Sequence, residues 1–77
     1  MKMKINGTAF VKARESHLLG VLELANKADV TFKTLSRVEK GQSVKQVSLR
    51  KVIKALGLTI EEAFAKRMVI MENDEKK

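Results

Sequence analysis

Most of the charged side chains that could take part in chemistry are cationic. The 77 residues include no cysteine and a single histidine, so a thiolate metal site is impossible and one imidazole is too few for most metal or acid–base arrangements. Sixteen lysines and arginines stand against nine aspartates and glutamates, which gives a net charge of +7. Such a surplus attracts polyanions, of which nucleic acid is the commonest. We expect neither an enzyme nor a bound metal or cofactor.

The positive charge is concentrated in the first three quarters of the chain. Residues 1–57 contain twelve basic and four acidic side chains, whereas residues 58–77 contain four basic and five acidic ones. The surplus either serves solubility alone or indicates a nucleic-acid partner. No apolar run approaches the roughly 20 residues that a membrane span needs, and no signal-peptide pattern opens the chain. We therefore expect a cytoplasmic protein without a membrane partner.

The length of the chain predicts a single domain, residues 1–77, built around one core. Apolar residues recur at helical spacing along most of it, and this pattern predicts an all-α fold. Thr31 and Thr59 are suitable helix N-caps, while Gly41 and Gly57 are suitable helix ends. The five expected helices cover about residues 8–17, 21–27, 32–40, 47–56 and 60 onward.

The two ends of the chain allow more than one interpretation. Met1–Ile5 alternates apolar and cationic residues, which indicates a strand or an extended arm within residues 1–7. Residues 67–72 either prolong the last helix or form a strand, because they combine β-branched and other apolar side chains. One outcome is a small β-ribbon between Met1–Ile5 and Met68–Glu72, within or between subunits. Residues 73–77 are expected to be a frayed tail.

The sizes and spacing of residues 21–40 fit two helices that meet at a tight turn. The fifth position of this pattern is Ala25, where the two helices approach closely and only a small side chain fits. The ninth position is Asp29, in the turn, where a positive φ is expected and Asp is tolerated. Leu35 and Val38 fall at core positions of the second helix. This pattern predicts a helix-turn-helix, whose second helix is built to lie in the major groove of DNA.

Residues 24–41, with the sequence LANKADVTFKTLSRVEKG, resemble the lambda-repressor-like (XRE) helix-turn-helix proteins. Asn6–Glu15 upstream and Lys54–Phe64 downstream resemble the same family, so the resemblance covers about residues 6–64. It implies a compact five-helix domain that binds double-stranded DNA as a homodimer. It also implies a role as a transcriptional regulator in a prokaryote or phage.

The family's recognition helix corresponds to the segment that begins at Thr31. The resemblance places Phe32, Lys33 and Arg37 against base edges, and Thr34 where contact with phosphate or base is usual. Lys33 and Arg37 can donate to guanine O6 and N7, and Phe32 can rest on a thymine methyl group. The alternatives are a solvated helix face for the two cations and a hydrophobic contact with the preceding helix for Phe32. Phosphate contacts are expected from four residues after the helix: Lys40, Gln42, Ser43 and Lys45.

Arg14 and Glu39 match positions that form an internal ion pair in several relatives, so we expect their role to be structural. Two features depart from the family pattern. Relatives commonly carry Thr or Ser followed by Gln at the start of the second helix, where the Gln contacts phosphate. Here that pair is Gly20–Val21, and this hydrogen-bonding group is absent. The apolar cluster formed by Leu18–Leu19 and Val21–Leu22 is either extra core or a site for another protein.

One recognition helix contacts only a few base pairs, so specificity normally requires two copies. We expect the nearly neutral segment 58–72 to carry the dimer interface, through Ile60, Phe64, Met68, Ile70 and Met71. The main hypothesis is a sequence-specific regulator, favoured as a repressor, that binds a palindromic operator. One alternative is an antitoxin that binds a toxin and its own promoter, and another is an adaptor that has lost DNA binding. A second protein partner, such as a toxin or a polymerase, belongs with these hypotheses.

Overall fold

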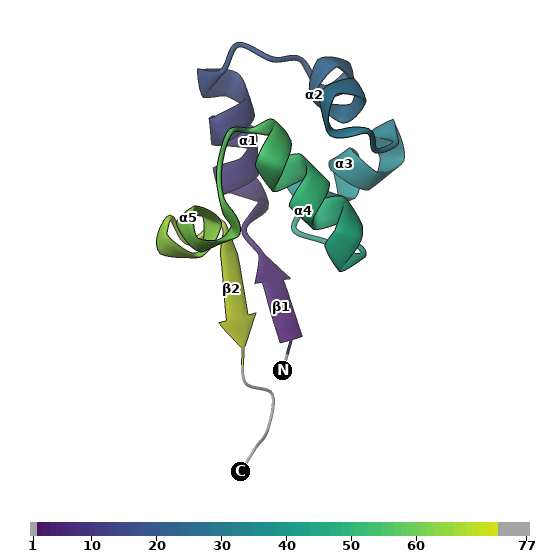
Figure 1. Cartoon of the computed structure of the whole chain (residues 1–77). Helices are drawn as coiled ribbons and strands as arrows, with labels where there is room; N and C mark the ends of the chain where they lie inside the picture. Colours follow the sequence, from purple (N-terminus) through teal and green to yellow (C-terminus); the bar gives the residue numbers. More distant parts are fainter. Residues whose placement is uncertain (1, 73–77) are drawn as a thin grey trace.

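The computed structural model describes residues 2–72, in which five helices form the body and two short strands leave it together as a ribbon (Figure 1). The expected five-helix fold with a terminal ribbon is therefore confirmed. No helix in this range is long and apolar enough to cross a membrane. The expectations for Met1 and for the tail at residues 73–77 lie outside the described residues. In chain order the elements are β1 (Lys2–Ile5), α1 (Gly7–Ser16), α2 (Val21–Ala28), α3 (Phe32–Glu39), α4 (Gln46–Ala55), α5 (Ile60–Ala65) and β2 (Val69–Glu72).

The ribbon forms within one chain and joins its two ends. β1 and β2 pair antiparallel, with Ile5 opposite Val69 and Lys2 opposite Glu72. The segment 67–72, which the sequence left open between helix and strand, thus contributes a strand. Of the two expected arrangements, a ribbon within one subunit or between two subunits, the structure shows the first.

The backbone at Arg67 explains why a strand follows α5. Arg67 has φ of 62°, in the left-handed region that commonly ends a helix. The amide of Met68 then donates to the carbonyl of Ala63 over 2.9 Å. β-Branched Val69 and Ile70 come next, and both suit an extended chain. The helix therefore stops before the apolar run that could have prolonged it.

Three helices begin at a polar side chain. Asn6 accepts from the amide of Ala9 at the start of α1, and Thr31 accepts from the amide of Thr34 at the start of α3. Thr59 caps α5 in the same way. The N-cap of α4 makes no side-chain hydrogen bond. The first N–H groups of α4 are therefore left for solvent or a ligand.

The core contains residues from all five helices and from the ribbon. Phe10 of α1, Leu24 of α2, Leu35 of α3 and Val52 of α4 are each 0% exposed. α2 packs against both α3 and α4, and α1 packs against α3. Met68 is also buried in this core, at 2% exposure. Its side chain is therefore part of the monomer and cannot serve as an exposed dimer contact, which corrects that expectation.

Two glycines allow the start of α1 to approach the end of α3. A Cβ atom on Gly7 would collide with the backbone carbonyl of Glu39. Gly41, just after α3, has φ of 76°, and a Cβ atom there would lie 3.2 Å from the carbonyl oxygen of Ile5. Only glycine adopts such a conformation at little cost. The C-terminal end of α3 is thus held by β1 and α1, which fixes the direction of the helix.

Candidate nucleic-acid interface

α2 and α3 meet at a tight turn. α2 ends at Asp29, which has φ of 58° and ψ of 45°, as expected for the turn position. The amide of Val30 donates to the carbonyl of Ala25 over 3.0 Å, and Thr31 then caps α3. Ala25 is 2% exposed, because α3 lies against α2 where its small side chain leaves room. This geometry sets α3 across α2, as a helix-turn-helix requires.

α3 is anchored on one face and exposed on the other. Leu35 and Val38 are both 0% exposed, whereas Lys33 and Arg37 project from the opposite face and are exposed. Phe32 leaves 53% of its surface exposed, so any packing of its ring against α2 is partial. The outer face of α3 therefore presents cations and one aromatic ring to an external partner.

The segment after α3 is bonded back to the helix. The amide of Gln42 donates to the carbonyl of Arg37 over 2.8 Å. The Arg37 side chain donates through Nε and Nη2 to the carbonyl of Ser43, over 3.2 Å and 3.0 Å. Lys40, Gln42, Ser43 and Lys45 are all exposed. The four expected phosphate contacts thus lie on one surface loop, next to α3.

A shallow hollow lies between α3, this loop and the start of α4, and six residues line it: Thr34, Arg37, Ser43, Val44, Lys45 and Ser48. Hydroxyl and cationic donors therefore come together at the uncapped N-terminus of α4. Backbone N–H groups and the helix dipole favour an anion at such a place. Ser48 was missed in the sequence, although a hydroxyl in the first turn after a basic loop is a usable signal.

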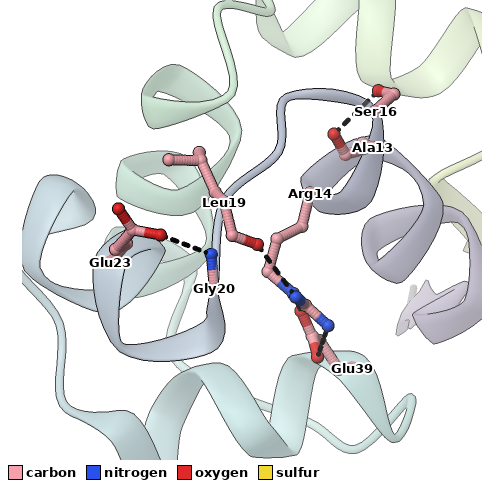
Figure 2. Close-up of polar contacts among 7 residues, drawn as sticks. All are labelled: Ala13, Arg14, Ser16, Leu19, Gly20, Glu23 and Glu39. Carbon is pink, nitrogen blue, oxygen red and sulfur yellow. Dashed lines mark hydrogen bonds and ion pairs between the residues drawn. The ribbon is translucent and has the colours of Figure 1, made fainter.

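Arg14 joins three segments of the chain (Figure 2). Its Nε donates to Glu39 Oε2 over 2.6 Å, its Nη2 to Glu39 Oε1 over 3.4 Å, and its Nη1 to the Leu19 carbonyl over 3.0 Å. The two charged side chains are only 13% and 12% exposed. The hydrogen bond to Glu39 is the main cause that raises the pKa of Arg14. Because Glu39 is the only acidic residue among residues 31–45, its pairing leaves the positive field of that surface uncompensated.

The start of α2 offers little to a phosphate. The carboxylate of Glu23 accepts from the amide of Gly20 over 2.8 Å (Figure 2), which places a negative charge at this helix end. Leu18 and Leu22 are 90% and 63% exposed. Leu19 packs against the core instead. The apolar cluster is thus divided, part serving as extra core and part facing solvent.

The expected dimer residues do not all lie on one surface, because Ile70 borders a hollow with Glu39, Lys40 and Gly41 at the end of α3. Ile60 and Phe64 are 40% and 37% exposed, and they border a groove with Ile53 and Val69. Ile70 is half-buried. The backbone of Met71 belongs to β2, but its side chain lies outside the described residues. Ile60 and Phe64 are therefore the exposed apolar members of the expected set.

The fold and this surface define a helix-turn-helix domain with a basic, exposed second helix. A family model described as Helix-turn-helix matches residues 12–67. The chain belongs to this family, the lambda-repressor-like (XRE) proteins, and it is accordingly a DNA-binding transcription regulator. The family is a regulatory one and not a family of enzymes. No curated protein matches the sequence.

Proposed function

We propose that the protein is a repressor that binds a palindromic operator as a homodimer. The observation that carries this proposal is the position of α3. Leu35 and Val38 hold the helix from behind, while no described part of the chain covers Phe32 and Lys33 in front. A helix presented in this way can enter the major groove, which is wide enough to admit it.

The contacts divide into two classes. Lys33 donates to guanine O6 or N7, and Phe32 packs on a thymine methyl group, so these two residues select sequence. The other contacts, which fix register and affinity, go to phosphates. They come from Thr31 and Thr34 at the start of α3, and from the loop residues Lys40, Gln42, Ser43 and Lys45.

The dimer forms through the apolar surface around Ile60 and Phe64. This surface lies apart from α3, so two copies can pair there and still present both recognition helices. Half-sites are then expected one helical turn apart, about 34 Å. Occupying such an operator blocks the access of polymerase, which gives repression. This role also places the protein in the cytoplasm.

An antitoxin is the second candidate function, because Leu18 and Leu22 are exposed beside the start of α2 and favour a protein partner there. A toxin encoded beside the protein would bind there while α3 binds the promoter. Copurification with such a neighbour, lost on Leu18→Asp with Leu22→Asp, would favour this function. Retention of the neighbour by that variant would argue against it.

Selection of duplexes from a random DNA pool, at two salt concentrations, tests the main proposal. We expect a palindromic winner whose half-sites are one turn apart. Lys33→Ala should abolish the preference at one base pair of each half-site, at a cost of about 1 to 3 kcal/mol. Lys66→Ala removes the same charge from the end of α5 and serves as the control. Enrichment of no sequence at either salt concentration would refute the proposal.

A further inference from the structure

Arg37 is bound to the loop that follows its own helix. Both Nε and Nη2 donate to the carbonyl of Ser43, over 3.2 Å and 3.0 Å. The backbone carbonyl of the same residue accepts from the amide of Gln42 over 2.8 Å. Arg37 therefore holds the loop with its side chain and with its backbone at once.

The position of Arg37 in α3 favours a contact with the DNA backbone over a contact with a base. Residues near the N-terminus of a recognition helix contact base edges, and Phe32 and Lys33 occupy the first turn of α3. Arg37 lies in the last turn. Its Nε–Nη2 edge, one of the paired-donor edges that can engage an acceptor pair, is already occupied by Ser43. Arg37 is thus poorly placed to discriminate between bases.

The loop that Arg37 holds carries several donors. Lys40, Gln42 and Lys45 are all exposed on it, and Lys45 also lines the hollow at the start of α4. A loop that is free to move must be ordered on binding, and this ordering lowers affinity. A loop that is already bonded to the recognition helix can meet the DNA backbone without that loss. Its donors then engage together and in a fixed register.

We infer that Arg37 is a positioning residue, which holds residues 40–45 in place for phosphate contact and does not read a base. This inference rests on the proposed DNA-binding role of α3 and assigns base selection to Phe32 and Lys33. Charge alone does not perform the positioning, because the two bonds to one carbonyl need the rigid donor geometry of a guanidinium group. Lysine at this position should therefore fail to replace arginine.

The DNA test compares Arg37→Ala, Arg37→Lys and Lys33→Ala, with Lys66→Ala as a charge-matched control on α5. Fluorescence anisotropy measures binding to the selected operator and to its single-base-pair variants over a range of KCl concentrations. We expect Arg37→Ala to weaken every complex by one common factor of roughly tenfold or more. The slope of log K against log salt should fall by more than the ~0.9 per protomer that one lost phosphate contact gives. Lys33→Ala should change the ranking of the duplexes instead.

Relaxed preference at a single base pair in Arg37→Ala would overturn the inference, because Arg37 would then read that base. A slope change of one phosphate contact per protomer or less would also overturn it, because the loop would then have kept its contacts. Arg37→Lys keeps the charge and so isolates the geometry. If it matched the wild type in affinity and salt slope, the positioning role would be refuted.

A measurement without DNA separates this inference from the proposed function. Amide exchange of Gln42, whose N–H donates to the Arg37 carbonyl, should be followed by NMR in the free protein and should accelerate by about tenfold in Arg37→Ala and in Arg37→Lys. It should stay unchanged in Lys33→Ala. If the wild type bound no DNA, the proposed function would fail, yet this result would still decide whether Arg37 holds the loop. Unchanged exchange in both Arg37 variants would refute the inference by itself.

Discussion

A single guanidinium group at Arg14 connects α1, the segment before α2 and the end of α3. Its three hydrogen bonds reach both carboxylate oxygens of Glu39 and the carbonyl of Leu19. Removing this pair from water costs desolvation free energy. The pair stabilises the fold only if its hydrogen bonds offset that cost. The pair fixes the last turn of α3 relative to α1. The direction of the recognition helix therefore depends on a side chain that is expected to make no DNA contact.

Removal of Arg14 should destabilise the protein strongly. Arg14→Ala leaves the Glu39 carboxylate mostly buried and without its cation, so the free energy of unfolding should fall by about 3 kcal/mol, measured in urea. Lys51→Ala is the control, because it removes an ion pair with Asp29 that is 3.7 Å long and whose acidic side chain is 95% exposed. That loss should stay within about 0.5 kcal/mol. Equal losses in the two variants would contradict the structural role of Arg14.

The same pair predicts how stability responds to pH. The folded-state pKa of Arg14 is raised above its ordinary value. Stability from a raised pKa is fully present below the unfolded pKa and is lost only as the pH rises through the folded pKa. Both values are strongly alkaline, so Arg14 should contribute no change between about pH 6 and 9. A loss of stability in that window that disappeared in Arg14→Ala would contradict this assignment.

The cap of α3 links helix stability to DNA binding. Thr31→Ala removes the acceptor for the Thr34 amide and should lower the free energy of unfolding by about 1 kcal/mol. Thr59→Ala removes the equivalent bond to the Glu62 amide in α5 and should cost a similar amount. Only Thr31→Ala should also weaken operator binding, by roughly fivefold or more, because it frays the turn that carries Phe32. Urea titration and anisotropy on both variants provide the comparison, and equal effects on DNA would refute it.

The helix-turn-helix could be predicted from the sequence because it depends on contacts between near neighbours. Ala25, Asp29, Leu35 and Val38 lie within a few turns of one another, and their sizes and spacing define the crossing of α2 and α3. The conformation of residues 67–72 could not be predicted in the same way. Their composition suits a helix or a strand, and the choice depends on the partner strand at the opposite end of the chain.

Side-chain bonding within the candidate site was less accessible to sequence reasoning. Spacing places Arg37 on the outer face of α3, and the structure agrees. The spacing does not reveal that the guanidinium turns toward Ser43, because that direction depends on the path of the loop. Exposed Leu18, with φ of 58°, occupies a left-handed position after α1, where relatives frequently have a helix-ending glycine. No described contact accounts for its choice over glycine.

In the proposed dimer, assembly depends on the groove between α4 and α5. Phe64→Glu places a charge on a residue that is 37% exposed, so the monomer should stay folded while the dimer dissociates. Sedimentation should then show a monomer, and operator affinity should fall by at least about 100-fold, because the two half-sites are no longer engaged together. Circular dichroism verifies the fold. Substitution is a sharper test than truncation at Lys66, since truncation would remove Met68 and Val69 from the core.

Leu22→Glu is the matched control for the dimer. It places the same charge on an exposed leucine of α2, which is 63% exposed and lies outside the expected interface. We expect its sedimentation to equal that of the wild type. If Leu22→Glu dissociated the dimer while Phe64→Glu did not, the interface would lie at the start of α2, and the assignment to α4 and α5 would be wrong.

The terminal ribbon also bears on how the chain folds. Asn6 and Arg67, whose contact joins the ribbon to the helices, are 61 residues apart in sequence. Closing so long a loop costs chain entropy before the contacts between the two ends can stabilise it. The two ends should therefore meet after the central helices have packed. Interactions that are missing from the folding transition state act mainly on the unfolding rate. We therefore expect the ribbon to slow unfolding and to have little effect on the folding rate.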